Sequence, residues 1–102
     1  MRIIKELMEQ MSDELEGAGK YIDDALKYKD SDKMLADMYY TMSLQELKHH
    51  NELHSQVVRM ITDYRKEHGE PPVAMQAVYD WEHEKAISKA KEIKNSQTMY
   101  KE

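Results

Sequence analysis

Only two short stretches of this sequence are suited to interrupting a helix, and they divide the chain into three long segments. Residues 29–32 (Lys-Asp-Ser-Asp) are polar and suited to capping a helix. Residues 69–72 (Gly-Glu-Pro-Pro) combine a residue that ends helices with one that begins them. The only other glycines are Gly17 and Gly19, and there is no other proline. The chain is therefore predicted to fold as three helices.

Apolar residues recur every three or four positions in each segment, which is the spacing of one helix face. We expect helices over about residues 2–28, 32–68 and 72–94, followed by a frayed tail over 95–102. At 1.5 Å per residue the second helix would be about 55 Å long, so its far end would project from the bundle or pack on another chain. Its apolar stripe consists of Leu35, Met42, Leu53, Val57, Met60 and Tyr64.

The composition agrees with an all-α fold and excludes several kinds of function. A chain of 102 residues suits one domain spanning residues 1–102, and 40% hydrophobic residues with few glycines and prolines are typical of a helical domain. The net charge of −5 argues against nucleic acid and anionic membranes as partners. Without cysteine there is no disulfide, thiolate site or iron–sulfur cluster. The charged N-terminus and the lack of a long apolar run predict a soluble cytoplasmic protein.

Glu46 and His49 fall on the apolar stripe of the second helix. At about 100° per residue both lie within roughly 20–40° of the stripe's centre, which aims them at the core. A buried carboxylate without a partner is strongly destabilising, so we expect something to compensate it. Carboxylate and imidazole on one helix face are a usable ligand pair for iron, manganese or zinc.

The other two helices also place a glutamate beside their apolar faces. Glu14 lies roughly 60° from the centre of the first stripe, and Glu82 lies roughly 30° from the centre of the third. The short connection at residues 29–32 makes the first two helices antiparallel, and Glu14 and Glu46 are similarly distant from it. Three carboxylates and one imidazole therefore suggest a shared cation. Gly17 and Gly19 would either allow close helix approach beside Glu14 or form a simple packing notch.

At this level the sequence resembles the ferritin-like fold, in particular its rubrerythrin-type members. The resemblance covers roughly residues 5–93, and the family's usual first motif has alanine where this chain has Gly17. It implies a di-iron carboxylate site that oxidises Fe²⁺ with O₂ or peroxide. The motifs that carry it are Glu14-x-x-Gly17-x-x-x-Tyr21, Glu46-x-x-His49 and Glu82 on the third helix.

The resemblance implies a role for each matching residue. Glu46 would bridge two metal ions, Glu14 and His49 would be terminal ligands, and Glu82 would be a further carboxylate. The complete site in that family uses four helices and a second Glu-x-x-His, which this sequence lacks. Two protomers that pair their first two helices would supply a four-helix bundle with duplicated ligands, as in the encapsulated ferritins.

The leading hypothesis is thus a ferritin-like ferroxidase or peroxide scavenger, with Glu46 and His49 as catalytic residues and iron as cofactor. Manganese or zinc would be substitutes, and the partners would be a second copy of the chain or a larger ring. An electron donor, or an enclosing protein compartment in the cytoplasm, is a further expected partner. The alternative is a non-enzymatic oligomerisation module in which Glu46 and His49 pair with each other or with Lys85 or Lys89.

The remaining histidines and tyrosines have simpler interpretations. His50 and His54 are four residues apart and could bind a metal at the surface, but their angular positions favour a solvated face. His83 points away from the third stripe and is also expected at the surface. Tyr21 and Tyr39 lie within two turns of the glutamates, where they would be core residues, ligand-bonding groups or redox-active neighbours.

Overall fold

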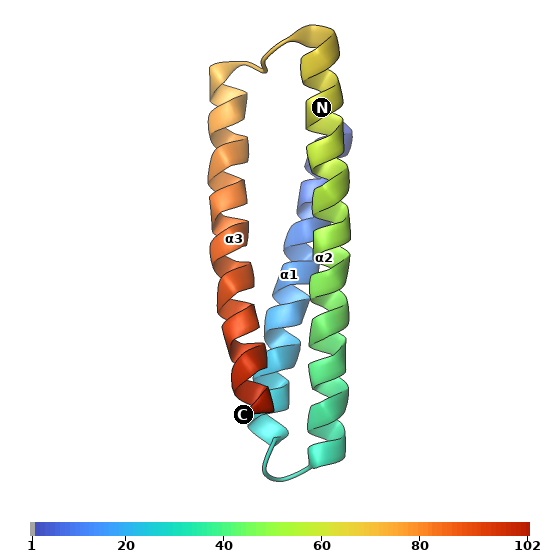
Figure 1. Cartoon of the computed structure of the whole chain (residues 1–102), viewed down its shortest axis with the longest axis vertical. Coiled ribbons are helices and arrows are strands. Elements are labelled where there is room, and N and C mark those ends of the chain that lie inside the picture. Colours follow the sequence, from blue (N-terminus) through green and yellow to red (C-terminus); the bar gives the residue numbers. More distant parts are fainter. Residues whose placement is uncertain (1) are drawn as a thin grey trace.

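The computed structural model describes residues 2–102, which form three α-helices and no strand. Helix α1 spans Arg2–Tyr28, α2 spans Lys33–His68 and α3 spans Val73–Lys101. Each helix runs antiparallel to the one before it in the chain (Figure 1). Together they form an elongated bundle whose Cα atoms extend over 55 × 17 × 17 Å. Within residues 2–102, no helix contains an apolar stretch long enough to cross a membrane. The all-α prediction is confirmed.

Both predicted breaks lie at the ends of helices. The carboxylate of Asp32 accepts a hydrogen bond of 3.1 Å from the Leu35 N–H and so caps the start of α2. Gly69 ends α2 with a φ of 77°, and its N–H donates to the Arg65 carbonyl at 2.9 Å. The positive φ favours glycine over residues with a Cβ. These local signals placed the boundaries of α1 and α2 correctly to within one residue.

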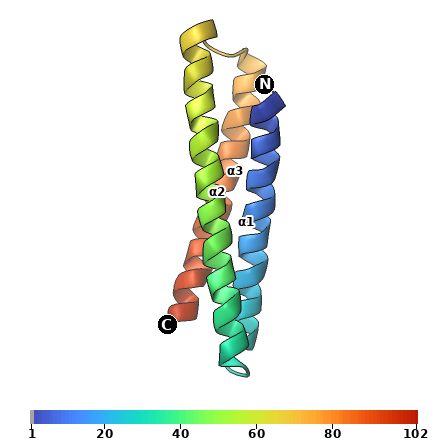
Figure 2. The ribbon, with the colours of Figure 1, turned by 90° about the vertical axis from the view of Figure 1, so that its right-hand side faces the viewer.

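The closest packing is between α1 and α2, which lie side by side along most of α1 (Figure 2). Small and aliphatic side chains fill the contact, and α3 joins it mainly through its C-terminal half. The buried residues of this core are Leu15, Ala18, Ile22, Ala25, Ala36, Leu47, Ile93 and Tyr100. A second buried cluster, near the start of α1, consists of Ile4, Met11 and Val57.

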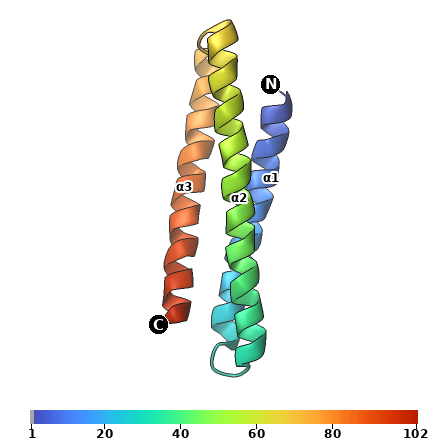
Figure 3. The same cartoon turned by 45° about the vertical axis from the view of Figure 1, so that its right-hand side comes forward.

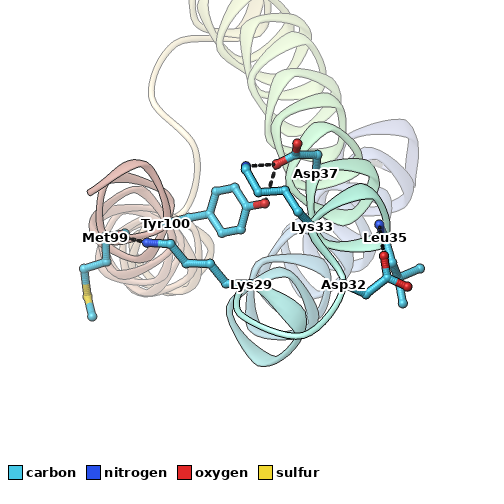
Figure 4. A network of polar contacts seen from close by, with 7 residues as sticks. All are labelled: Lys29, Asp32, Lys33, Leu35, Asp37, Met99 and Tyr100. Carbon is cyan, nitrogen blue, oxygen red and sulfur yellow. Dashed lines mark hydrogen bonds and ion pairs between the residues drawn. The ribbon is translucent and has the colours of Figure 1, made fainter.

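The prediction of a frayed tail over 95–102 is wrong, because α3 continues to Lys101. Gln97 and Tyr100 are 7% and 3% exposed, so the last turns pack on the bundle. The Tyr100 ring stacks on Tyr40 with centroids 4.8 Å apart, and its hydroxyl donates to the Asp37 carboxylate (Figure 4). Burial of Gln97 and Tyr100 stabilises the last turns of α3, where few residues are of the types that end a helix.

The overhang expected for α2 lies partly against α3 of the same chain, and none of its residues from 58 to 68 is fully buried. The last turns of α2 extend beyond the start of α1 and run beside the first turns of α3 (Figure 3). Arg65 connects the two helices there, because its guanidinium donates to the Gln76 side-chain oxygen at 2.8 Å. It also pairs with Glu70 at 3.3 Å. These contacts attach the end of α2 to α3 and the connecting loop.

The buried face of α2 is turned by about 80° from the predicted stripe. Of the predicted stripe residues only Val57 is buried, and the others are half-buried. The difference arises because small side chains, which a hydrophobic pattern hardly registers, make the closest contacts with α1. The buried residues of α2 are Ala36, Ser43, Leu47, His50 and Val57.

Candidate metal centre

Glu14, Glu46 and His49 come together on one side of the α1–α2 pair. Nδ1 of His49 lies 3.6 Å from Oε2 of Glu14 and 4.0 Å from Oε1 of Glu46. Within residues 2–102 this is the one set of three acidic, histidine or cysteine side chains whose ligand atoms all lie within 4.8 Å. The sequence prediction of a shared position for these three residues agrees with the geometry.

Helix pairing and a glycine position these side chains. Glu46 and His49 are one turn apart on α2, and the antiparallel α1 brings Glu14 to the same height. A Cβ atom at Gly17, one turn from Glu14, would lie 3.2 Å from Oε2 of Glu46. The glycine therefore leaves the space into which the Glu46 carboxylate extends.

The Glu14 carboxylate disfavours the charge of Glu46. The pKa of Glu46 is raised from its ordinary value, first by a hydrogen bond with the Glu14 carboxyl, then by burial and by the Glu14 charge. His49 acts in the opposite direction. Glu46 is consequently protonated more readily than an isolated glutamate, and a cation bound between the two carboxylates would compensate their charges.

The donor set fits one transition-metal ion for each chain. Two carboxylates and one imidazole are ligands suited to Fe²⁺, Mn²⁺ or Zn²⁺. The side chains of Glu14, Glu46 and His49 are 29%, 27% and 51% exposed, so solvent reaches the centre. They thus lie at the edge of the α1–α2 contact, and the prediction that Glu46 and His49 point into the core is wrong, because the α2 stripe was misplaced.

Glu82 is not part of this group. It lies on α3, its carboxylate is 3.9 Å from Nζ of Lys85, and its side chain is 40% exposed. It lines a groove between α3 and the other two helices, on the side of α1 and α2 that holds His50. The structure therefore brings together three of the four predicted metal ligands.

His50 corrects another expectation, because it is buried rather than solvated. The residue is 5% exposed, and its Nδ1 lies 3.2 Å from the Met11 carbonyl oxygen. Its position seven residues after Ser43 and three after Leu47 puts it on the true buried face. His54, one turn further on, is half-buried and stacks on the exposed His83, with ring centroids 5.1 Å apart.

Two polar residues that tie the helices together escaped the sequence analysis. The Gln97 amide donates to the Ser43 hydroxyl at 3.0 Å, and that hydroxyl donates to the Ala18 carbonyl at 2.7 Å. This buried chain of hydrogen bonds joins α3, α2 and α1. A serine within an apolar face was the available signal, because such a residue needs a partner when buried.

The tyrosines near the centre form a stack. The rings of Tyr21 and Tyr39 have centroids 6.1 Å apart, and Tyr28 continues the stack from Tyr39 at 6.2 Å. All three are half-buried. They pack along the α1–α2 contact between the centre and the connecting turn.

No family model, no curated protein and no solved structure matches this chain. The convergence of Glu14, Glu46 and His49 is the observation that bears on function.

Proposed function

We propose that the chain is a ferritin-like protein that binds a divalent transition metal at Glu14, Glu46 and His49 and oxidises Fe²⁺. The proposal is carried by the convergence of three ligand side chains from two helices within 4.8 Å. The raised pKa of Glu46 beside Glu14 supports it, because unliganded carboxylates held this close repel each other. A bound cation that neutralises the two carboxylates would explain why they are held so close together.

We further propose that two copies of the chain complete the site. The half-buried stripe residues Leu35, Met42 and Leu53 lie on the same face of α2 as Glu46. Pairing this face with its two-fold copy would bury the stripe and bring two sets of ligands together. The resulting four-helix bundle would hold two ions with four carboxylates and two imidazoles.

In the proposed reaction Fe²⁺ is the substrate, and two ions each give up one electron and become Fe³⁺. The two electrons and two protons from solvent convert one O₂ to H₂O₂, or one H₂O₂ to two water molecules. Glu14 and His49 would hold the ion as ligands from one chain only, and Glu46 would hold it together with the ligands of the second copy. His49 is the most exposed of the three side chains, so ions and protons from solvent would reach the centre beside it. Glu46 and His49 therefore contact the reacting ion directly.

The experiment combines metal content with mass. The protein is loaded with Fe²⁺ without oxygen, freed of excess metal, sized by light scattering and analysed for iron per chain. We expect about one iron per chain in a dimer or larger ring, with rapid oxidation when O₂ is admitted. Glu46→Gln and His49→Gln should lose the iron, whereas Glu16→Gln and His68→Gln, at exposed positions, should keep it.

Two results would contradict the proposal. A chain that takes up neither Fe²⁺, Mn²⁺ nor Zn²⁺ at these residues has no metal function there. Iron that remains after Glu46→Gln and His49→Gln is bound elsewhere.

A second candidate is a module without metal, in which His49 forms ion pairs with Glu14 and Glu46. The distances of 3.6 and 4.0 Å favour it, because they are within the range of an ion pair. His49→Gln would then destabilise the metal-free fold, although modestly for side chains this exposed. In the metal-site interpretation the same change leaves the metal-free fold as stable as before and abolishes binding.

A further inference from the structure

A groove of about 1070 Å³ separates α3 from the α1–α2 pair. Apolar residues such as Met11, Leu15 and Val57 line it, together with three of the five histidines of the chain. These are His50 and His54 from α2 and His83 from α3. None of the three belongs to the carboxylate centre.

His54 and His83 face each other across this groove. Their rings lie nearly parallel, with an interplanar angle of 18° and centroids 5.1 Å apart. Neither imidazole makes a hydrogen bond or ion pair with another residue in the range 2–102. Two imidazoles from different helices are thus held close together with their nitrogens uncommitted.

His50 lines the same groove, although the ring nitrogens of the three histidines do not all lie within 4.8 Å of one another as the side chains stand. A carbonyl oxygen accepts hydrogen bonds only, so the 3.2 Å contact with Met11 places the ring proton on Nδ1 of His50. Its Nε2 then carries the free lone pair that a metal ion requires. A ring nitrogen fixed by a backbone carbonyl is the usual support of a metal-binding histidine.

We propose that His50, His54 and His83 bind a borderline divalent cation (Zn²⁺, Ni²⁺ or Cu²⁺), which fastens α3 to α2 across the groove. Two histidines four residues apart on one helix face are a common zinc-binding spacing, and the third comes from the facing helix. Binding requires the stacked rings to turn so that one nitrogen of each faces the ion. Imidazole ligands favour these cations over Mg²⁺ or Ca²⁺.

The electrostatic setting is compatible with this site. Burial, followed by the neighbouring His83 and His50, lowers the pKa of His54, so that its ring is neutral and ready to bind metal near neutral pH. Asp80 and Glu82 from α3 line the same groove, and the chain carries a net charge of −5. The charged residues that face the groove from α1 include Glu16, Lys20 and Asp23.

The test uses Zn²⁺ alone and first removes the carboxylate centre. In the double variant Glu46→Gln/His49→Gln, calorimetric titration should show one Zn²⁺ bound per chain and a rise in Tm. Adding His54→Gln or His83→Gln should weaken Zn²⁺ binding at least tenfold. Adding His68→Gln, at an exposed position near the end of α2, should leave the affinity unchanged.

A second measurement uses the same double variant, Glu46→Gln/His49→Gln, so that the carboxylate centre does not compete for the ion. In it, small amounts of Cu²⁺ should broaden the imidazole NMR signals of His54 and His83 before that of His68. The proposal is overturned if the double variant binds no Zn²⁺, or if binding survives both His54→Gln and His83→Gln. It is also overturned if Cu²⁺ leaves the His54 and His83 signals as sharp as that of His68. The stacked pair would then be a packing contact.

Discussion

A Cβ atom at Gly17 would lie 3.2 Å from Oε2 of Glu46, closer than side chains normally approach a Cβ. Gly17 faces α2 beside the carboxylate centre, and its missing side chain makes room for the glutamate. Gly19, two residues later, is different, because a Cβ there would make an ordinary contact of 3.6 Å with Cδ1 of Ile93. One glycine therefore bears on the centre and the other only on packing.

We expect the size of residue 17 to control metal affinity. Gly17→Ala requires only a small shift of the flexible Glu46 carboxylate, and removing a glycine from a helix stabilises it by up to about 1 kcal/mol. Gly17→Leu should displace Glu46 and reduce metal affinity at least tenfold. Denaturation and metal titration measure the two effects. Gly19→Ala is the control, which should raise stability and leave affinity unchanged; equal affinities for all three variants would contradict the prediction.

The metal-free protein should become more stable on mild acidification. Because the folded pKa of Glu46 is raised, its contribution is fully present below the unfolded value of 4.5 and is lost as pH rises through the folded pKa. Urea denaturation of metal-free protein between pH 7 and 4.5 measures this trend. In Glu46→Gln the trend should be weaker and the stability at pH 7 higher. A variant less stable than the parent at pH 7 would favour the ion-pair module instead.

The buried hydrogen bonds from Gln97 to Ser43 and from Ser43 to Ala18 should contribute more to folding stability than a hydrogen bond made by an exposed serine. Ser43→Ala leaves the Gln97 amide without its partner in the core, and we expect a loss of about 1–3 kcal/mol. Ser55→Ala removes a hydroxyl that donates to the Asn51 carbonyl at an exposed site, and it should change stability by less than about 0.5 kcal/mol. Urea denaturation compares the two variants, and equal effects would show that the buried chain adds nothing.

Tyr100 should hold the end of α3 against the α1–α2 turn. Its hydroxyl bonds to Asp37, and Lys33 and Lys29 lie 5.7 and 5.6 Å from the ring centroid (Figure 4). Tyr100→Ala should cost about 3 kcal/mol or more of folding stability through lost packing. Tyr100→Phe retains the stack on Tyr40 and should mainly speed amide exchange in the last turns of α3. Unchanged exchange in both variants would mean that these turns are held by other contacts.

The same contact predicts a loss of stability at high pH. Burial, then the hydrogen bond to Asp37, raises the pKa of Tyr100 to about 12, above its ordinary value of 10.0. The tyrosine therefore contributes stability below pH 10, and this contribution is lost as pH rises from 10 through 12. Denaturation at pH 9 to 12 should show this decline in the parent chain and less of it in Tyr100→Phe. A parallel decline in both would exclude Tyr100 as its source.

Asp37 should affect how the folding stability of the protein changes at acid pH. Its pKa is lowered first by the hydrogen bond from Tyr100 and then by that from Lys33. Its contribution is present above the ordinary value of 3.8 and is lost as pH falls through the lower folded pKa. Asp37→Asn should flatten the stability profile in that acid range, whereas Asp63→Asn, on the exposed side of α2, should not. Identical acid profiles for the two variants would contradict this role.

The number of helices, their order and most of their ends follow from local features of the sequence. The polar residues 29–32 and Gly69 cap helices through contacts with residues only a few positions away. Helix ends of this kind can therefore be predicted from the residue types alone. The meeting of Glu14 with Glu46 and His49 was also predictable, because a short turn fixes the relative heights of two antiparallel helices.

Tertiary structure alone decided where α3 lies and which side of α2 is buried. The position of Glu82 and the helical form of the last residues depend on how α3 packs. Tyr100 packs on Tyr40 and bonds to Asp37, which lie sixty or more positions earlier in the chain. On α2, Ala36, Ser43 and His50 are buried because small side chains let α1 approach closely, which hydrophobicity does not encode. The pairing of His54 with His83 has the same origin, since only packing brings two exposed-looking histidines from different helices together.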